Sequence, residues 1–224
     1  MEAYRVPEAG AADVTFSVTK RGMDAVFAAG ETLTEESAEY ILTGAEFAGR
    51  ILRHGAFALH SSAVVYRGRA VLFSAPSGTG KSTHTALWLD RFGADAYILN
   101  DDKPVIRREG DCLFAYGTPW SGKTRLNRNL RVPLHAVVFL TQSPDNRIAP
   151  MSTTEAVKML YYQAMRCDSS PRGTAALLDL IGDVAEHIPL FRLHCNMNPD
   201  AAQTAFRALF PEQSSQTRDT EEQE

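Results

Sequence analysis

The chain has 224 residues, a formal net charge of −4 and 44% hydrophobic residues. This length suits one domain with an extension, or at most two small domains, and the apolar fraction is ordinary for a soluble globular protein with a sizeable core. Cys112, Cys167 and Cys195 are far apart and form no Cys-x-x-Cys pattern, so neither a disulfide framework nor a zinc site is indicated. No apolar segment approaches membrane-spanning length and the N-terminus has no apolar leader region, so we expect a cytoplasmic protein with no membrane or nucleic-acid partner.

The two ends of the chain differ from its middle. Residues 1–54 are expected to form an N-terminal extension, with a strand at 13–19, where polar and apolar residues alternate, and an amphipathic helix that begins at Thr34. Residues 55–210 are expected to form the main domain, with that helix on its outside. Residues 211–224 contain five acids, one arginine and no aromatic residue, which predicts a disordered acidic tail.

Two strand-like runs, 57–66 and 70–74, are separated by Arg67-Gly68-Arg69, which indicates a tight hairpin. An antiparallel neighbour at this point favours an α/β fold with a mixed sheet flanked by helices over an all-parallel doubly wound sheet. Further strands are predicted at 96–100, 105–108, 112–116, 134–141 and 190–194. Helices are predicted at 154–165, 174–186 and 200–209.

The stretch Ser74-Ala-Pro-Ser-Gly-Thr-Gly-Lys-Ser-Thr83 follows the apolar run 70–73 and precedes a helix with one apolar face. A phosphate-binding loop (P-loop) needs this order of strand, turn and helix, because glycines let the backbone approach a ligand closely and a helix N-terminus attracts anions. Lys81 would reach the β/γ-phosphates of a nucleotide, and the Ser82 hydroxyl would bind Mg²⁺. The predicted nucleotide-binding residues are Pro76, Ser77, Gly78, Thr79, Gly80, Lys81, Ser82 and Thr83.

A second stretch, Gly117-Thr-Pro-Trp-Ser-Gly-Lys-Thr124, matches the formal pattern Gly-x-x-x-x-Gly-Lys-Ser/Thr fully, whereas Ala75 replaces the first glycine in the first stretch. Pro119 and Trp120 lie inside this second loop, and the polar residues after it reach Pro133 too soon for a long buried helix. The context therefore favours the first stretch as the nucleotide loop. The second stretch is interpreted as either a substrate-side phosphate clamp or a chance match.

Asp101 and Asp102 follow the predicted strand 96–100, about one crossover after the loop, so both can meet the loop at one edge of the sheet. Phosphoryl transfer needs a carboxylate for the metal and a group that accepts the attacking proton, and this pair can supply both. The residues alone leave open which aspartate does which, and ordinary turn chemistry also explains the pair. For His60 and for His84 a structural hydrogen bond and a role in the site are both open.

Lys123, Arg125, Arg128 and Arg131 lie in a segment that has no acid from residue 112 to 144. Beside a glycine-rich turn, this charge suits phosphate or a negatively charged substrate, and a solvated basic loop explains it equally well. The prediction places Lys123, Arg125 and Arg128 on the acceptor side of the site.

Three segments resemble, in order and spacing, the catalytic domain of the HPr kinase/phosphorylase family and its HPr-kinase-like relatives. They are Leu59-His-Ser-Ser-Ala63, Ser77-Gly-Thr-Gly-Lys-Ser-Thr-His84 and Leu99-Asn-Asp-Asp-Lys-Pro104. The loop is also similar to that of ATP-dependent phosphoenolpyruvate carboxykinases, which share that fold. The resemblance spans residues 56–210 and implies a P-loop kinase domain that uses ATP and Mg²⁺. It implies that Lys81 binds phosphates, Ser82 and Asp102 hold the metal, Asp101 is the base toward a substrate serine, and His60 lies near the transferred phosphate.

Two departures from that family bear on function. Only about 55 residues precede the core, against about 100 or more for an independent domain, so the family's large N-terminal domain is not expected. The family's Glu-x-Arg-Gly-x-Gly signature is replaced by Ala115-Tyr-Gly-Thr-Pro-Trp120, which removes a metal-binding glutamate. Relatives without this signature include enzymes that phosphorylate serines of other peptides or proteins, so we expect a serine kinase with a protein or peptide acceptor. A small-molecule kinase and a non-catalytic nucleotide-sensing module are the alternatives, and the hexamers of the resembled family imply a possible homo-oligomer.

Overall fold

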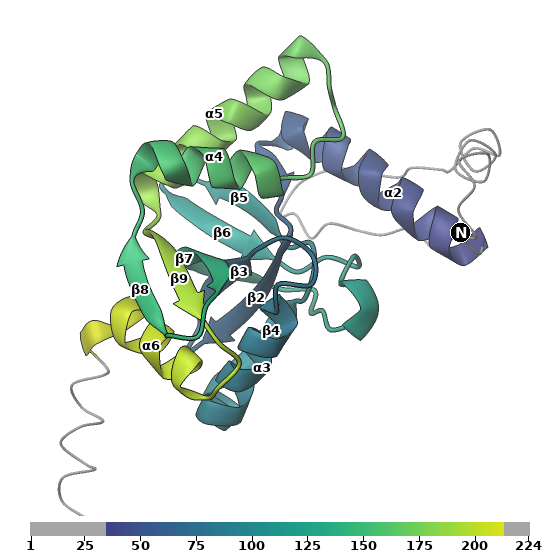
Figure 1. Ribbon diagram of the computed structural model, residues 1–224. Helices are drawn as coiled ribbons and strands as arrows, with labels where there is room; N and C mark the ends of the chain where they lie inside the picture. Colours follow the sequence, from purple (N-terminus) through teal and green to yellow (C-terminus); the bar gives the residue numbers. More distant parts are fainter. Residues whose placement is uncertain (1–34, 213–224) are drawn as a thin grey trace, which may run out of the picture.

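The computed structural model describes residues 35–212, which form a mixed α/β fold with a curved mixed sheet and flanking helices (Figure 1). The predicted strand at 13–19, Thr34 and residues 213–224 of the predicted tail lie outside the described residues. Within residues 35–212, no helix combines the length and the apolar character needed to cross a membrane.

The elements follow the predicted order closely. The α-helices are α2 (Glu35–Ile51), α3 (Lys81–Phe92), α4 (Thr153–Gln163), α5 (Pro171–His187) and α6 (Asp200–Leu209). The strands are β1 (Ala56–Ala58), β2 (Ser61–Tyr66), β3 (Arg69–Ser74), β4 (Ala96–Asn100), β5 (Val105–Glu109), β6 (Cys112–Tyr116), β7 (Arg131–Gln142), β8 (Arg147–Pro150) and β9 (Leu190–Cys195). Helix α5 begins earlier than predicted, because the Ser170 hydroxyl accepts from Gly173 N at 3.0 Å and Pro171 stands in the first turn.

The sheet is mixed, as the hairpin argument predicted. Its strand order is β1-β5-β6-β7-β3-β2-β4, with β9 pairing both β7 and β8. Strands β2 and β3 are antiparallel through the tight turn at Arg67 and Gly68, whereas β3, β7 and β9 run parallel. The carboxyl ends of these three parallel strands therefore meet at one edge, where ligands of α/β proteins commonly bind.

The prediction of one strand over 57–66 is wrong. The chain makes β1, breaks at Leu59 and His60, and resumes as β2, because β1 pairs with β5 whereas β2 pairs with β3 and β4. The break places His60 beside the end of β3, where the Ser74 hydroxyl donates to the His60 carbonyl at 2.8 Å. Strand β8 was not predicted either.

The central strands bury both of their faces. In β3, Leu72 packs into the hydrophobic cluster under α4 and α5, whereas Val71 and Phe73 pack into the cluster with α3 and α6. Figure 1 shows these two helix pairs on opposite sides of the sheet. Two buried faces explain why β2 and β3 have runs of consecutive apolar residues instead of a period of two.

Helix α2 covers a third cluster, formed with β1, β5 and β6. Trp120, from the loop after β6, stacks on Phe47 of α2 with ring centroids 4.7 Å apart, and its indole nitrogen donates to the Tyr40 carbonyl at 2.9 Å. Gly44 makes this approach possible, since a side chain there would lie 2.8 Å from the indole. Helix α2 is therefore joined to the loop that follows β6.

Candidate functional site

The glycine loop, residues 75–80, connects the end of β3 to the first residue of α3. Gly78 and Gly80 have φ angles of 79° and 105°, a region that L side chains rarely adopt. Gly80 is the N-cap of α3, and no side chain caps this helix. A concave turn followed by an uncapped helix N-terminus is an arrangement that can hold an anion.

Ala75, the departure from the formal pattern, has a structural explanation. Its side chain is fully buried in the cluster with α3 and α6, and its φ is not in the left-handed region. The position therefore requires a small residue but not the conformational freedom of glycine.

Lys81 lies over the start of the glycine loop. Its Nζ donates to the carbonyl oxygens of Ala75 at 2.9 Å and Pro76 at 3.3 Å, and the residue is 7% exposed. Burial lowers the pKa of Lys81, while the carboxylates of Asp102 and Asp101 oppose this effect. Both predicted acids are therefore close enough to act electrostatically on the lysine.

Asp101 is connected to α3 through a buried serine. The Ser62 hydroxyl donates to Asp101 Oδ1 at 2.5 Å and lies 3.0 Å from the Thr85 hydroxyl, which belongs to α3. Ser62 is fully buried and Asp101 is 6% exposed. Sequence reasoning did not single out Ser62 or Thr85, although a serine in an otherwise apolar strand is a signal, because a buried hydroxyl needs a hydrogen-bond partner.

Asp102 lies between His60 and Lys103. His60 Nε2 is 3.3 Å from Asp102 Oδ1, and the Lys103 ammonium donates to Oδ2. Burial alone would raise the pKa of Asp102, but the hydrogen bonds and charges of His60 and Lys103 hold it below its usual value. The structure thus brings Asp102 and His60 together, as expected for residues of one site.

The second glycine-rich stretch, 117–124, does not continue into a long helix. It ends in a three-residue 3₁₀ helix, Gly122–Thr124, before β7. Its glycines serve close packing: a Cβ on Gly117 would lie 1.9 Å from the Arg128 carbonyl oxygen, and one on Gly122 would lie 3.1 Å from Asp102 Cβ. Gly122 N donates to the Tyr40 hydroxyl at 3.0 Å, so this amide binds α2.

The basic segment, residues 123–131, lies against the end of β4. Asp101 N donates to the Leu126 carbonyl at 3.1 Å, and Arg128 N donates to the Leu99 carbonyl at 2.9 Å. Lys123, Arg125 and Arg128 are exposed, and the Arg128 guanidinium lies 4.4 Å from the Tyr97 ring centroid. The basic residues are therefore fixed by their backbone next to the two aspartates.

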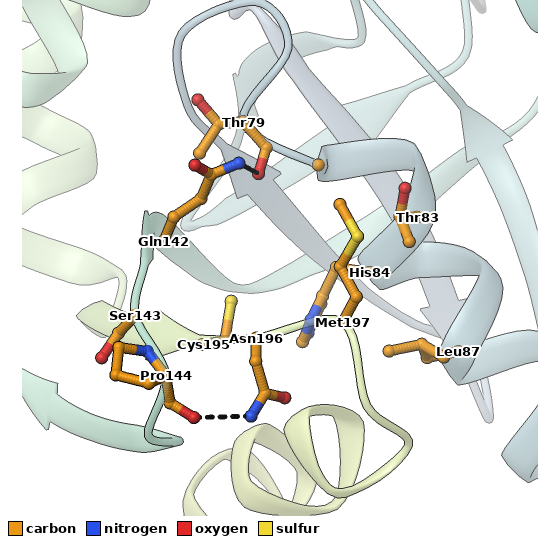
Figure 2. Close-up of a pocket in the computed structure, with 11 residues that line it drawn as sticks. Thr79, Thr83, His84, Leu87, Gln142, Ser143, Pro144, Cys195, Asn196 and Met197 are labelled. Atoms are coloured by element: carbon orange, nitrogen blue, oxygen red, sulfur yellow. Dashed lines mark hydrogen bonds between the residues drawn. The ribbon is translucent and has the colours of Figure 1, made fainter.

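A cavity of about 440 Å³ lies beside the glycine loop, between α3 and the segments that follow β7 and β9 (Figure 2). Its lining residues are Thr79, Gly80, Thr83, His84, Leu87, Gln142, Ser143, Pro144, Cys195, Asn196 and Met197. Sequence reasoning placed only the loop residues and left His84 open. No group of three or more His, Cys, Asp or Glu side chains suited to a metal occurs among residues 35–212.

The fold and these residues define a mixed α/β protein in which a buried aspartate, Asp101, and a partly buried one, Asp102, lie near a glycine-rich loop and a helix N-terminus. The chain belongs to the ScmC family, since the model of the SynChlorMet cassette protein ScmC matches residues 47–200. The model that matches is that of ScmC and not that of an HPr kinase family.

Among solved structures, the chain is similar to the Hpr(Ser) kinase/phosphatase from Coxiella burnetii. The identity is 11%, the TM-score is 0.39, and the alignment covers 74% of this chain and 95% of the other. A TM-score of this size establishes neither a shared fold nor a shared activity. No curated protein matches the chain.

Proposed function

We propose that this protein is an ATP- and Mg²⁺-dependent phosphotransferase that phosphorylates a serine of a protein or peptide. The observation that carries the proposal is the buried carboxylate of Asp101, linked through Ser62 to the helix that begins at Lys81. Phosphoryl transfer to a hydroxyl needs a base and a group that binds the phosphates, and Asp101 and Lys81 can supply them from adjoining elements.

Residues 76–83 fit the phosphates of a nucleotide. A Cβ on Gly78 would meet nothing within 4 Å, so there is open space beside the turn at this residue, and no side chain caps the helix that follows. Lys81 would exchange its loop carbonyls for the phosphate oxygens, which are stronger acceptors because they are charged.

The metal would be held by the Ser82 hydroxyl and the Asp102 carboxylate, since Mg²⁺ prefers oxygen ligands and usually keeps several waters. Asp102 fits this role because its lowered pKa keeps it ionised at neutral pH. Bound there, the ion would neutralise charge on the phosphates.

Asp101 would accept the proton of the acceptor hydroxyl. Ser62 occupies Oδ1, which leaves Oδ2 for the acceptor. His60 would donate to the transferred phosphoryl group from its place beside Asp102. The exposed Lys123, Arg125 and Arg128 would bind acidic groups of the acceptor.

The test compares nucleotide binding with transfer. Calorimetry with ATP and Mg²⁺ should show binding to the wild type and loss of binding in Lys81→Ala. With labelled ATP and a library of serine peptides, Asp101→Asn should lower transfer by about 100-fold or more while ATP still binds. Asp95→Asn, at an exposed ion pair with Arg67, is the control and should retain both. A wild type that does not bind ATP, or full transfer by Asp101→Asn, contradicts the proposal.

Ala115 supports a second candidate, a nucleotide-sensing module without transfer. It is fully buried in β6 and stands where the resembled family carries a metal-binding glutamate. Under this alternative, ATP would bind and raise the melting temperature but stay uncleaved with every acceptor, including small molecules.

A further inference from the structure

His84 is a buried histidine that the proposed transfer reaction does not use. It lies in the first turn of α3, is 3% exposed, and packs on Phe73 with ring centroids 4.5 Å apart. The Trp88 indole N–H, one helical turn later, donates to His84 Nε2 at 3.3 Å. His84 Nε2 is therefore an acceptor and carries no proton.

This hydrogen bond fixes the state of the other ring nitrogen. An imidazole ring always carries at least one proton, and Nε2 carries none, so the single proton of the neutral ring is on Nδ1. His84 Nδ1 is buried and has no hydrogen-bond partner. A buried donor without an acceptor destabilises a protein, so a ligand that supplies an acceptor to Nδ1 would be stabilised by it.

His84 lines the cavity beside the glycine loop (Figure 2). The cavity lies at the carboxyl ends of the parallel strands, since Gln142 ends β7 and Cys195 ends β9. Apolar contacts come from Leu87 and Met197, and the Gln142 amide, which donates to the Thr79 carbonyl at 3.3 Å, connects the far wall to the loop. A cavity volume of about 440 Å³ is within the range of small-molecule sites.

We infer that this cavity binds the nucleoside of the nucleotide whose phosphates lie on the glycine loop, and that His84 Nδ1–H donates to an acceptor atom of that nucleoside. The inference rests on the nucleotide binding proposed above. The same cavity wall contains Thr79, Gly80 and Thr83, so one ligand can reach from the loop into the cavity. Met197 is 59% exposed, and its flexible side chain is the wall residue best able to move when the ligand reaches Nδ1.

Two substitutions separate the donor function of Nδ1 from the acceptor function of Nε2. In His84→Gln the amide oxygen can still accept from Trp88, but the Nδ1 donor is gone. In His84→Asn the amide N–H takes the place of Nδ1–H, but the acceptor for Trp88 is gone. Each variant keeps one of the two hydrogen-bonding functions of the ring.

The experiment measures the affinities of ADP and of inorganic tripolyphosphate for the full chain. His84→Gln should weaken ADP binding about three- to tenfold, as expected for one neutral hydrogen bond, while His84→Asn stays near the wild type and tripolyphosphate binding is unchanged in both. Similar ADP affinities in all three proteins, or an equal loss for both ligands in His84→Gln, overturn the inference. If neither ligand binds the wild type, the proposed function itself fails.

A measurement on the wild type avoids any effect of substitution on folding. In ¹H–¹⁵N spectra of the histidine rings, ADP should shift the His84 Nδ1 signal and tripolyphosphate should not. Equal responses to the two ligands would overturn the inference.

Discussion

Acidification should destabilise this protein through His84. Burial lowers the pKa of His84 from 6.5 to about 4 in the folded chain. Between these values the unfolded chain binds a proton that the folded chain excludes, so the free energy of unfolding falls as the pH falls through this window. The difference of about 2.5 pKa units corresponds to about 3 kcal/mol in full, of which about 2 kcal/mol is lost between pH 7 and pH 5.

Urea denaturation of the wild type and of His84→Gln at pH 7, 6 and 5 tests this value. The glutamine does not titrate, so the wild type should lose about 2 kcal/mol more than the variant over this range. Two nearby groups titrate outside this pH range. Burial raises the pKa of Cys195 above its usual value of 9.0, so the thiol stays protonated, and the lowered pKa of Asp102 affects stability only as the pH falls below 3.8. Equal losses in both proteins would refute the burial argument.

Three further predictions concern Asp102 and the second glycine-rich stretch. Replacing Lys103 with Met should raise the pKa of Asp102, because a hydrogen bond and a charge that lower it are removed; an NMR titration of the carboxyl carbon measures this, and an unchanged pKa would contradict the assigned cause. Gly117→Ala should lower the free energy of unfolding, measured in urea, by more than about 3 kcal/mol, because its Cβ would lie 1.9 Å from a backbone oxygen. The control Gly68→Ala should lower it by only about 1 kcal/mol, since its Cβ meets nothing within 4 Å and only the left-handed φ is unfavourable. Tyr40→Phe should speed hydrogen exchange at the Gly122 amide, because that amide loses its acceptor; unchanged exchange would show that α2 does not hold the loop.

The sequence predicted the local parts of the fold well, because they depend on nearby residues. The β2–β3 hairpin followed from a turn of Arg67 and Gly68, whose φ angles of 44° and 76° suit the twist of the flanking strands. Helix α6 begins and ends at the predicted residues, because its apolar positions recur with the period of a helix. The strand, glycine-rich turn and helix around Lys81 were predicted because a short apolar run, a cluster of glycines and a helical period follow one another in the sequence.

What the sequence did not reveal depends on contacts between distant segments. The run 57–66 has no polar break strong enough to predict that β1 and β2 pair with different strands, so the break at Leu59 and His60 was not predicted. The Ser62 hydrogen bond to Asp101 joins residues that are 39 positions apart, and no periodicity encodes it. The Trp88 indole N–H donates to His84 Nε2, and this contact leaves His84 Nδ1 as the protonated nitrogen without a partner. Only the packed structure shows both facts.

The two glycine-rich stretches show why a pattern of residue types is weaker than the physical role of each glycine. In residues 75–80 the glycines adopt left-handed φ angles and leave the turn open, whereas Gly117 is needed because backbone from Arg128 passes where a side chain would stand. The second stretch fulfils the pattern but uses its Gly122 amide to bind Tyr40 and its Gly122 surface to contact Asp102. Under our proposal, the second stretch therefore holds Asp102 in place. Helix α2 contributes to the site because its Tyr40 binds this stretch.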